Sequence, residues 1–203
     1  MIHYDVIIVG AGVVGCLTAR ELSKYNLKIL LIDKASDVGS GTSAANSALV
    51  HAGYDALPGT LKAALNVQGN AMWDKLAAEL DFDFKRCGDY VVAIGEEEIP
   101  ALQTLYDRGK KNGVPEMEIV SAEAVRTRIP QINPQVSGAL YAATAGVCDP
   151  FGATIAAAEN AIQNGVTIQL STAFENFILE EDVIKGIQTN RDRKSTRLNS
   201  SHT

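Results

Sequence analysis

The chain has 203 residues, of which 46% are hydrophobic and 6% aromatic, and a formal net charge of −6. This length allows one large domain or one and a half small ones. The acidic balance argues against nucleic acid as a partner, because neutralising phosphates requires a basic face. No window holds the roughly 18 uninterrupted apolar residues that a spanning helix requires, so we expect no transmembrane segment.

Three cysteines lie far apart, at Cys16, Cys87 and Cys148, without a C-x-x-C pair. Their spacing does not suit a metal site, and their odd number is typical of a reducing compartment. A strand is predicted to start within the first few residues, which leaves no room for a signal peptide. We therefore expect a cytoplasmic protein without a metal, with peripheral attachment to the inner membrane face as a second option.

An apolar run at 6–9 predicts a buried strand that leads directly into a G-x-G-x-x-G pattern at Gly10, Gly12 and Gly15. In a strand–turn–helix unit, the first glycine permits the tight turn and the second lets the backbone approach a pyrophosphate. The third glycine lets helix and strand pack closely. The helix N-terminus then offers amide donors and a partial positive charge to phosphates. The loop therefore predicts a phosphate contact that includes Ala11.

A second apolar run at 29–32 predicts the next strand, and Asp33 and Lys34 follow it. We expect the Asp33 carboxylate to accept hydrogen bonds from the ribose of an adenine dinucleotide, with Lys34 beside it. Ala19 is small enough to let the helix lie on the sheet, and Asn26 suits a left-handed helix C-cap. The simpler interpretation is that the glycines serve turn geometry alone. The combined pattern favours dinucleotide binding.

The stretch 38–53 is small and polar, so it can approach a ligand closely with amides and hydroxyls. Thr60 then suits the N-cap of a helix that extends to Leu80. Apolar residues recur along it at helical spacing, and we expect its Met72 and Trp73 to be core residues. The apolar stripe comprises Leu61, Leu65, Met72, Trp73, Leu76 and Leu80.

From Phe82 onward the pattern changes from helical to alternating. Residues 82–84 and 90–94 predict two strands paired around a turn at Cys87-Gly88-Asp89. Further along we expect a helix at 96–111 ended by Gly113, a short helix capped by Ser121 and ended by Pro130, and a strand at 138–143.

Asp149 and Pro150 predict a helix start, as N-cap and first helical residue. Gly165 is expected to end this helix. The apolar stretch 166–170 suits the next parallel strand of the first sheet, and 174–189 suits a hairpin that covers this sheet as part of a meander.

Residues 192–203 differ from the rest, because they are basic, lack apolar periodicity and interrupt a strand pattern. Their first eleven residues match one reading frame of a common sequencing-library adapter. A natural serine-rich tail is the alternative. We expect this segment to be an artefact and the protein to continue beyond Arg191.

Three segments together resemble the FAD-dependent oxidoreductases of the D-amino-acid oxidase superfamily, and within it the glycerol-3-phosphate dehydrogenase and L-2-hydroxyglutarate oxidase branch. They are the glycine pattern, residues 41–53 and residues 146–151. The stretch 41–53 is the most specific. Its Ser/Thr run, followed by Asn-Ser, an apolar pair and His-x-Gly, is similar to the segment that these enzymes lay along the FAD pyrophosphate and flavin.

The resemblance implies a set of cofactor contacts. Those to the pyrophosphate or the ribityl chain of FAD are Ser40, Gly41, Thr42 and Ser43. Asn46 and His51 would approach the isoalloxazine ring, and Gly53 would let the backbone pass close to it. Two departures are visible. Asp33 stands where these enzymes more often have Glu, and His51 is followed by Ala-Gly-Tyr-Asp where the glycerol-phosphate enzymes usually carry Gly-Gly-x-Arg.

His51 is the candidate catalytic residue. A histidine near its ordinary pKa can accept the hydroxyl or amine proton of a substrate while hydride passes to flavin N5. The alternatives are a structural histidine in the cofactor pocket and a covalent flavin link. Tyr54 and Asp55 suit the substrate mouth or an ordinary polar loop.

The fold implied is α/β: a Rossmann-like FAD-binding domain of the glutathione-reductase type with an inserted α+β substrate domain, both incomplete. We place the FAD-binding domain at 1–80 and 146–191, the substrate-domain portion at 81–145, and the artefact at 192–203. Being incomplete, the chain itself is expected to bind FAD weakly and to be inactive.

The implied function is an FAD-dependent oxidoreductase that takes hydride from a small hydroxy acid, a polyol phosphate or an amino acid. Electrons would pass to oxygen, a quinone or another carrier. The alternatives are an NAD-dependent dehydrogenase and a non-catalytic dinucleotide-binding protein, such as an RNA-modification flavoprotein component.

Overall fold

The computed structural model describes residues 3–191, which form two compact units. Unit 1 holds the described residues up to Asn46 and from Pro150 onward, and unit 2 is Ser47–Asp149. These limits differ from the predicted domain boundaries after residues 80 and 145, because the helix α2 (Leu61–Leu80) packs on α3 (Ile99–Asn112) and β4 (Phe84–Arg86) within unit 2. The segment interpreted as an artefact, 192–203, lies outside the described residues.

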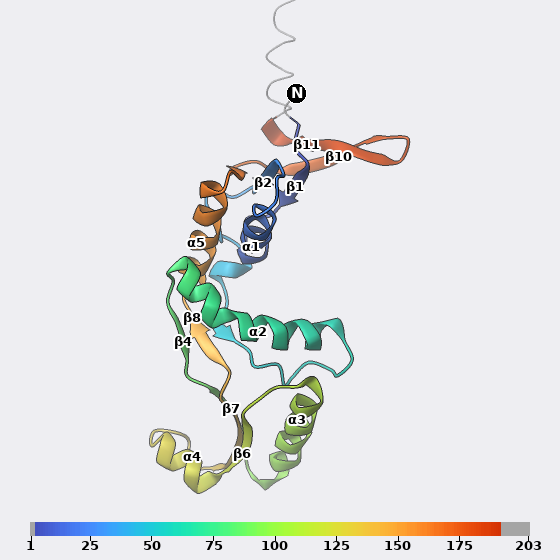
Figure 1. Cartoon of the computed structure of the whole chain (residues 1–203). Helices are drawn as coiled ribbons and strands as arrows, with labels where there is room; N and C mark the ends of the chain where they lie inside the picture. Colours follow the sequence, from blue (N-terminus) through green and yellow to red (C-terminus); the bar gives the residue numbers. More distant parts are fainter. Residues whose placement is uncertain (1–2, 192–203) are drawn as a thin grey trace, which may run out of the picture. The chain divides into compact units, whose positions relative to one another are not determined.

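Unit 1 is built on a parallel sheet with the strand order β1–β2–β9, of which Figure 1 labels β1 and β2. The strand β2 (Ile29–Ile32) lies between β1 (Val6–Val9) and β9 (Thr167–Gln169). All four residues of β2 are buried, as expected of a central strand in a sheet covered on both faces. The prediction of a third parallel strand at 166–170 is therefore confirmed.

Two helices of unit 1 pack against each other, α1 (Val13–Leu22) and α5 (Pro150–Gln163), as Figure 1 shows. Ala19 of α1 is fully buried, as predicted for a small residue on the packed face of this helix. The helix α5 starts at Pro150, and Gly165, with φ +93°, follows its end.

The predicted left-handed C-cap at Asn26 is wrong. Helix α1 ends at Leu22, and its C-cap Ser23 has the right-handed values φ −66° and ψ −10°. The chain leaves the helix through a turn in which the Tyr25 amide donates to the Leu22 carbonyl. Asn26 therefore lies outside the helix end.

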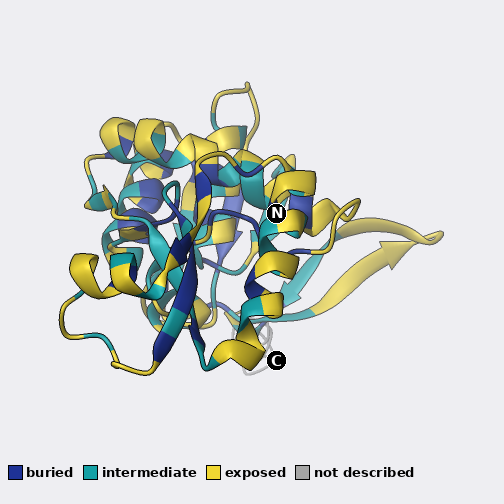
Figure 2. Ribbon diagram, turned by 90° about the horizontal axis from the view of Figure 1, so that it is seen from below, coloured by how far each residue is buried: buried dark blue, intermediate teal, exposed yellow. Residues whose placement is uncertain are grey.

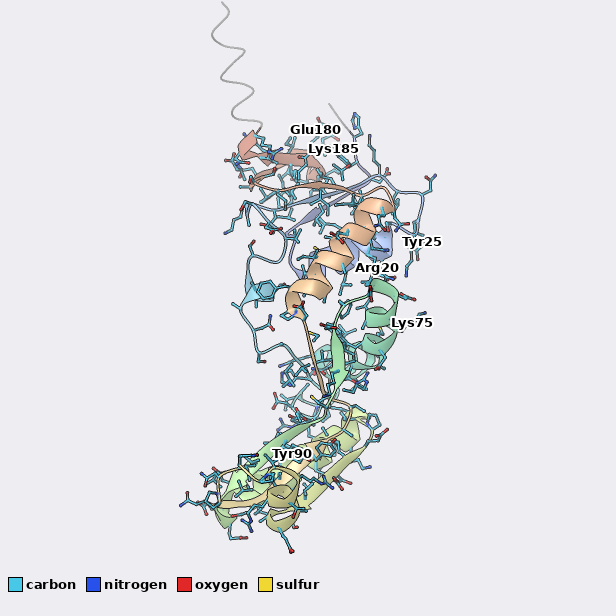
Figure 3. All side chains as sticks on the ribbon, turned by 90° about the vertical axis from the view of Figure 1, so that its left-hand side faces the viewer. Arg20, Tyr25, Lys75, Tyr90, Glu180 and Lys185 are labelled. Carbon is cyan, nitrogen blue, oxygen red and sulfur yellow. The ribbon has the colours of Figure 1, made fainter. Side chains whose placement is uncertain are left out.

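The strands β10 (Phe174–Glu180) and β11 (Val183–Thr189) form the predicted antiparallel hairpin. Figure 3 labels Glu180 and Lys185 in this hairpin. Its outer apolar residues are exposed, as the yellow ribbon of the hairpin in Figure 2 indicates, so the hairpin does not cover the sheet as predicted. These side chains are Phe177, Ile178, Leu179, Val183 and Ile184.

Unit 2 contains two antiparallel three-stranded sheets, β3–β8–β4 and β5–β7–β6. Buried apolar residues from β5, β6, β7 and α3 form one core cluster. The elements of unit 2 that follow or precede α2 are β3 (Leu49–Val50), β4 (Phe84–Arg86), β5 (Asp89–Ile94), α3 (Ile99–Asn112), β6 (Met117–Ser121), α4 (Ala122–Arg128), β7 (Val136–Ala142) and β8 (Gly146–Cys148).

The predicted pairing around Cys87-Gly88-Asp89 is wrong. Strand β4 pairs with β8, and β5 pairs with β7, so the turn connects two different sheets. The Gly88 amide donates to the carbonyl of Ala145, between β7 and β8, and this bond directs the chain from one sheet to the other. The two short strands flank this turn as the strands of a hairpin would. The strands with which they pair, however, lie more than 40 residues further along the chain.

Helix α2 begins after Thr60, whose hydroxyl accepts a hydrogen bond from the Ala63 amide, as predicted. Its apolar stripe is only partly core. Trp73 packs on Phe82 and Phe84 with ring centroids 5.9 and 5.7 Å apart. The expectation for Met72 is wrong, since it is 60% exposed, and Leu61 and Leu65 are exposed as well. These three residues lie on a common face of the helix that points away from the core of unit 2.

Within residues 3–191, no helix is both long enough and apolar enough to cross a membrane.

Candidate cofactor site

The glycine loop of unit 1 joins β1 to α1 and has the geometry that its sequence requires. Gly10 has φ +110°, and its amide donates to the Ile32 carbonyl of the neighbouring strand at 2.8 Å. Gly12 is the N-cap of α1. A Cβ at Gly15 would collide with the Gly10 carbonyl, so the close approach of helix and turn depends on this glycine. The first-turn amides of α1 have no carbonyl partner within the helix.

The Asp33 carboxylate lies against this loop. One carboxylate oxygen accepts a hydrogen bond from the Ala11 amide at 2.6 Å, and the other accepts one from Ala35 at 2.8 Å. The Asp33 carbonyl accepts from the Thr172 amide at 2.7 Å, just after β9. The acid therefore lies at the carboxyl edge of the sheet, where parallel α/β sheets bind their ligands.

The segment 37–46 returns to the same loop. The Gly39 amide donates to the Ala11 carbonyl at 2.8 Å. The Ser43 hydroxyl oxygen accepts a hydrogen bond from the Val13 amide, the first residue of α1, at 2.9 Å. Ser43 belongs to the single-turn helix η1 (Thr42–Ala44), and the Asn46 side-chain amide donates to the Ser43 carbonyl at 2.9 Å. The glycine turn and the serine–threonine stretch thus form one continuous polar surface.

The remaining predicted residues of unit 1 surround this surface. Ser40, Gly41 and Thr42 are exposed, and the Ser40 hydroxyl donates to the Asp37 carbonyl at 2.9 Å. Lys34 is also exposed and follows Asp33 directly. A hollow of about 250 Å³ lies between this segment and the start of α5. It is lined by Asp37, Val38, Gly39, Ser40, Ala44, Phe151, Thr154 and Ile155.

This donor set suits a dinucleotide. Backbone amides at a helix N-terminus and several hydroxyls favour a diphosphate, and a carboxylate at the strand end favours ribose hydroxyls. A Cβ built on Gly12 would lie 3.2 Å from the Ser43 hydroxyl oxygen, a tight contact that would require Ser43 to shift by a few tenths of an ångström. Within residues 3–191, no group of three His, Cys, Asp or Glu side chains is arranged to hold a metal ion.

The other predicted site residues lie in unit 2. The His51 side chain is exposed, and Gly53 has φ +115°. A Cβ at Gly53 would lie 2.8 Å from a methyl group of Val67, so the backbone passes close to α2 at this point. A hollow of about 80 Å³ opens beside them. It is lined by His51, Gly53, Tyr54, Asp55, Ala56, Lys62 and Asn66.

Tyr54 is buried, and its hydroxyl donates to one carboxylate oxygen of Asp89 at 2.7 Å. Within the described residues, the other carboxylate oxygen of Asp89 is buried without a hydrogen-bond partner. Burial raises the pKa of Asp89, while the Tyr54 hydrogen bond and the charge of His51 lower it. Burial also raises the pKa of Tyr54, and the Asp89 carboxylate adds to this increase.

Polar residues that the sequence interpretation did not identify support these segments. Asn70 and Arg86 bind the backbone at His51 and Thr144, and Asn112 donates to the carbonyls of Gly53 and Ala56. A single asparagine within an amphipathic helix gives no sequence signal of burial, because its partners come from distant segments.

The comparisons with known proteins decide the family. A protein-family model described as "FAD dependent oxidoreductase" matches residues 5–199 of the sequence. The chain belongs to this family.

Its relatives include a glycerol 3-phosphate dehydrogenase of Caloramator mitchellensis, 51% identical over 194 residues, which are 96% of this chain and 40% of that protein. An L-2-hydroxyglutarate dehydrogenase of Nematostella vectensis is 38% identical over 72% of this chain and 32% of its own length. The solved structure of L-α-glycerophosphate oxidase from Mycoplasma pneumoniae with FAD bound matches with a TM-score of 0.87, at 33% identity, over 94% of this chain and 50% of that chain. The chain thus spans 50% or less of the length of these relatives.

The predicted α/β fold of this family is confirmed, because the structural match extends through both units. The resemblance drawn from the glycine pattern and residues 41–53 identified the correct family and branch. A simple NAD-dependent dehydrogenase is not favoured.

Proposed function

We propose that the chain binds FAD and forms part of an oxidoreductase of the glycerol-3-phosphate and L-2-hydroxyglutarate dehydrogenase type. The observation that carries this proposal is the hydrogen bond between Ser43 and the Val13 amide, which joins the serine–threonine stretch to the glycine loop. A dinucleotide loop alone suits NAD equally well. The added hydroxyl-rich segment extends the binding surface beyond a pyrophosphate.

We assign the pyrophosphate contacts to the loop backbone at Ala11 and Gly12 and to the neighbouring hydroxyls. Gly10 shapes the turn, since its amide donates to the Ile32 carbonyl. Gly15 allows the close packing of α1 that presents these amides. The following segment would contact the pyrophosphate or the ribityl chain through the hydroxyls of Ser40, Thr42 and Ser43 and the backbone of Gly41. Asp33 would accept hydrogen bonds from the ribose in exchange for its present backbone bonds, and Lys34, which follows it directly, would lie beside it.

Asn46, His51 and Gly53 are assigned to the isoalloxazine end of the site. His51 is the residue that would accept a proton from the substrate hydroxyl or amine, and its exposed side chain is available for this role. When bound, FAD would supply the acceptor for the hydride, which leaves the carbon that bears this hydroxyl or amine.

We propose an anionic 2-hydroxy acid or a polyol phosphate as the substrate class, with amino acids as the less favoured option. The support comes from the relatives, which include a glycerol 3-phosphate dehydrogenase and an L-2-hydroxyglutarate dehydrogenase. The electrons would pass to oxygen, a quinone or another carrier. We keep the cytoplasm or the inner membrane face as the proposed location, and the division at residues 80 and 145 as the proposed limits of the FAD-binding and substrate parts.

The test uses a full-length protein that contains this chain. We expect it to be yellow when purified and its flavin absorbance to bleach when glycerol 3-phosphate or L-2-hydroxyglutarate is added without oxygen. A colourless protein that retains NAD would support the nicotinamide alternative. If the protein contains flavin but no small hydroxy acid, polyol phosphate or amino acid reduces it, a non-catalytic role would be supported.

A further inference from the structure

The side chain of Asn70 is buried in the middle of α2, with 6% of the residue exposed. Its amide nitrogen donates two hydrogen bonds, one to the carbonyl of His51 and one to that of Thr144, both at 2.9 Å. The two acceptors lie 93 positions apart in the chain. Asn70 therefore joins the segment before α2 to the turn between β7 and β8, within unit 2.

Arg86 completes this arrangement from β4. Its guanidinium donates to the side-chain oxygen of Asn70 at 3.0 Å, to the backbone carbonyl of Asn70 at 2.8 Å, and to the carbonyl of Thr144. On its outer side it forms an ion pair with Asp74 at 2.6 Å. The amide orientation of Asn70 is thereby fixed, because its oxygen accepts from a cation and its nitrogen has two carbonyl partners.

The position of His51 depends on its backbone. Within residues 3–191 its imidazole makes no hydrogen bond, and it follows directly after β3, a strand of only two residues. The carbonyl that Asn70 holds belongs to His51 itself. The Cα of His51 carries both this carbonyl and the imidazole, so a displacement of the carbonyl that shifts the Cα also moves the imidazole.

We propose that Asn70, with Arg86, is the positioning residue of His51. The pair fixes the His51 backbone and so directs the imidazole toward the reacting groups. This inference rests on the proposed function, in which His51 acts at the flavin end of the site. It adds two residues that do not themselves contact cofactor or substrate.

The experiment follows the imidazole of His51 by ¹H–¹³C NMR, which is feasible because the chain has only three histidines. The signal is assigned with His51→Gln. We expect Asn70→Ala to move the His51 signal by more than its linewidth and to leave His3 unchanged. Arg86→Lys serves as the second variant if Asn70→Ala does not fold, and the same displacement is expected, because lysine cannot reproduce the forked contact to Asn70 and Thr144.

The matched control is Asn112→Ala. Asn112 is also an amide that donates to two carbonyls of this segment, but they belong to Gly53 and Ala56 rather than to His51. We expect it to lower stability while the His51 signal stays in place. The proposal is overturned if Asn70→Ala leaves the signal unmoved, or if the control displaces it equally.

Titration of the unmodified chain with FAD separates this inference from the proposed function. If FAD binds without moving the His51 signal, the assignment of His51 to the flavin end fails, while the comparison of Asn70→Ala with its control still decides the positioning role.

Discussion

The hydroxyl oxygen of Ser43 accepts a hydrogen bond from the backbone amide of Val13 at 2.9 Å. Thirty residues separate the two partners, and their contact brings the stretch 40–46 onto the N-terminus of α1. This bond engages the Val13 amide, but the Ser43 hydroxyl keeps its own proton and can donate it to a phosphate oxygen beside the other first-turn amides of α1. This contact is the structural basis for assigning both segments to one cofactor.

Replacing Ser43 with alanine removes the partner of the Val13 amide. We expect the free energy of unfolding to fall by about 1 kcal/mol, the usual size of such a hydrogen bond, in urea denaturation. Ser40→Ala is the control, because the Ser40 hydroxyl bonds only a local carbonyl three residues away. Equal stability of the Ser43 variant and the unmodified chain would show that the contact is dispensable.

Asp33→Ala tests the acid at the strand end. The carboxylate accepts from two backbone amides and is assigned to the ribose, so its loss should raise the dissociation constant for FAD by about tenfold to a hundredfold. Asp33→Glu keeps the carboxylate and should bind within a few-fold of the unmodified chain. Fluorescence quenching of FAD measures both. An unchanged constant in the alanine variant would remove Asp33 from the site.

The Tyr54–Asp89 pair predicts a pH dependence of stability. Burial raises the pKa of Asp89 from its ordinary value of 3.8, so the folded chain holds this proton to higher pH than the unfolded chain. The contribution of this group to stability is therefore full below about pH 3.8 and is lost as the pH rises through the raised pKa.

Asp89→Asn should remove this loss, because the carboxamide oxygen still accepts from Tyr54 while no charge is buried. We expect the variant to gain stability relative to the unmodified chain between about pH 4 and pH 7, in urea unfolding curves. Parallel pH profiles for the two proteins would contradict the prediction.

The three cysteines should differ in reactivity. Cys16 is fully buried in α1, and burial, followed by the charge of Asp33, raises its pKa to about 11. Cys87 is exposed, and Cys148 is half-buried with a raised pKa. With a thiol reagent at neutral pH we expect Cys87 to react first and Cys16 only on unfolding. Early modification of Cys16, identified by mass spectrometry, would show that α1 opens readily.

The sequence predicted local features well, because these depend on nearby residues. The glycine turn, the caps at Thr60 and Ser121, and the end of α5 at Gly165 are all decided within a few positions. The third parallel strand was also predictable, since a helix ended by glycine and followed by an apolar run is typical of such a unit.

The pairing of strands that lie far apart in the chain was harder to predict from the sequence. The short strands β4 and β5 alternate as a hairpin does, yet each pairs with a later strand of a different sheet. The helical spacing of Leu61, Leu65 and Met72 predicted a common face but not whether that face is covered. Asn70 was not identified for the same reason: its burial depends on Arg86 and Thr144, which no local pattern connects to it.

The dissociation constant of FAD for the unmodified chain and for Gly12→Ala tests the central claim most directly. A Cβ at Gly12 would lie 3.2 Å from the Ser43 hydroxyl oxygen, within the proposed diphosphate site. Gly69→Ala is the matched control. Gly69 lies in α2, and a Cβ added there would meet no neighbouring group within 4 Å. We predict that the unmodified chain and the control bind FAD alike and prefer it to NAD, and that Gly12→Ala binds at least about tenfold more weakly. Equal affinity of Gly12→Ala, or a preference of the unmodified chain for NAD, would contradict the account.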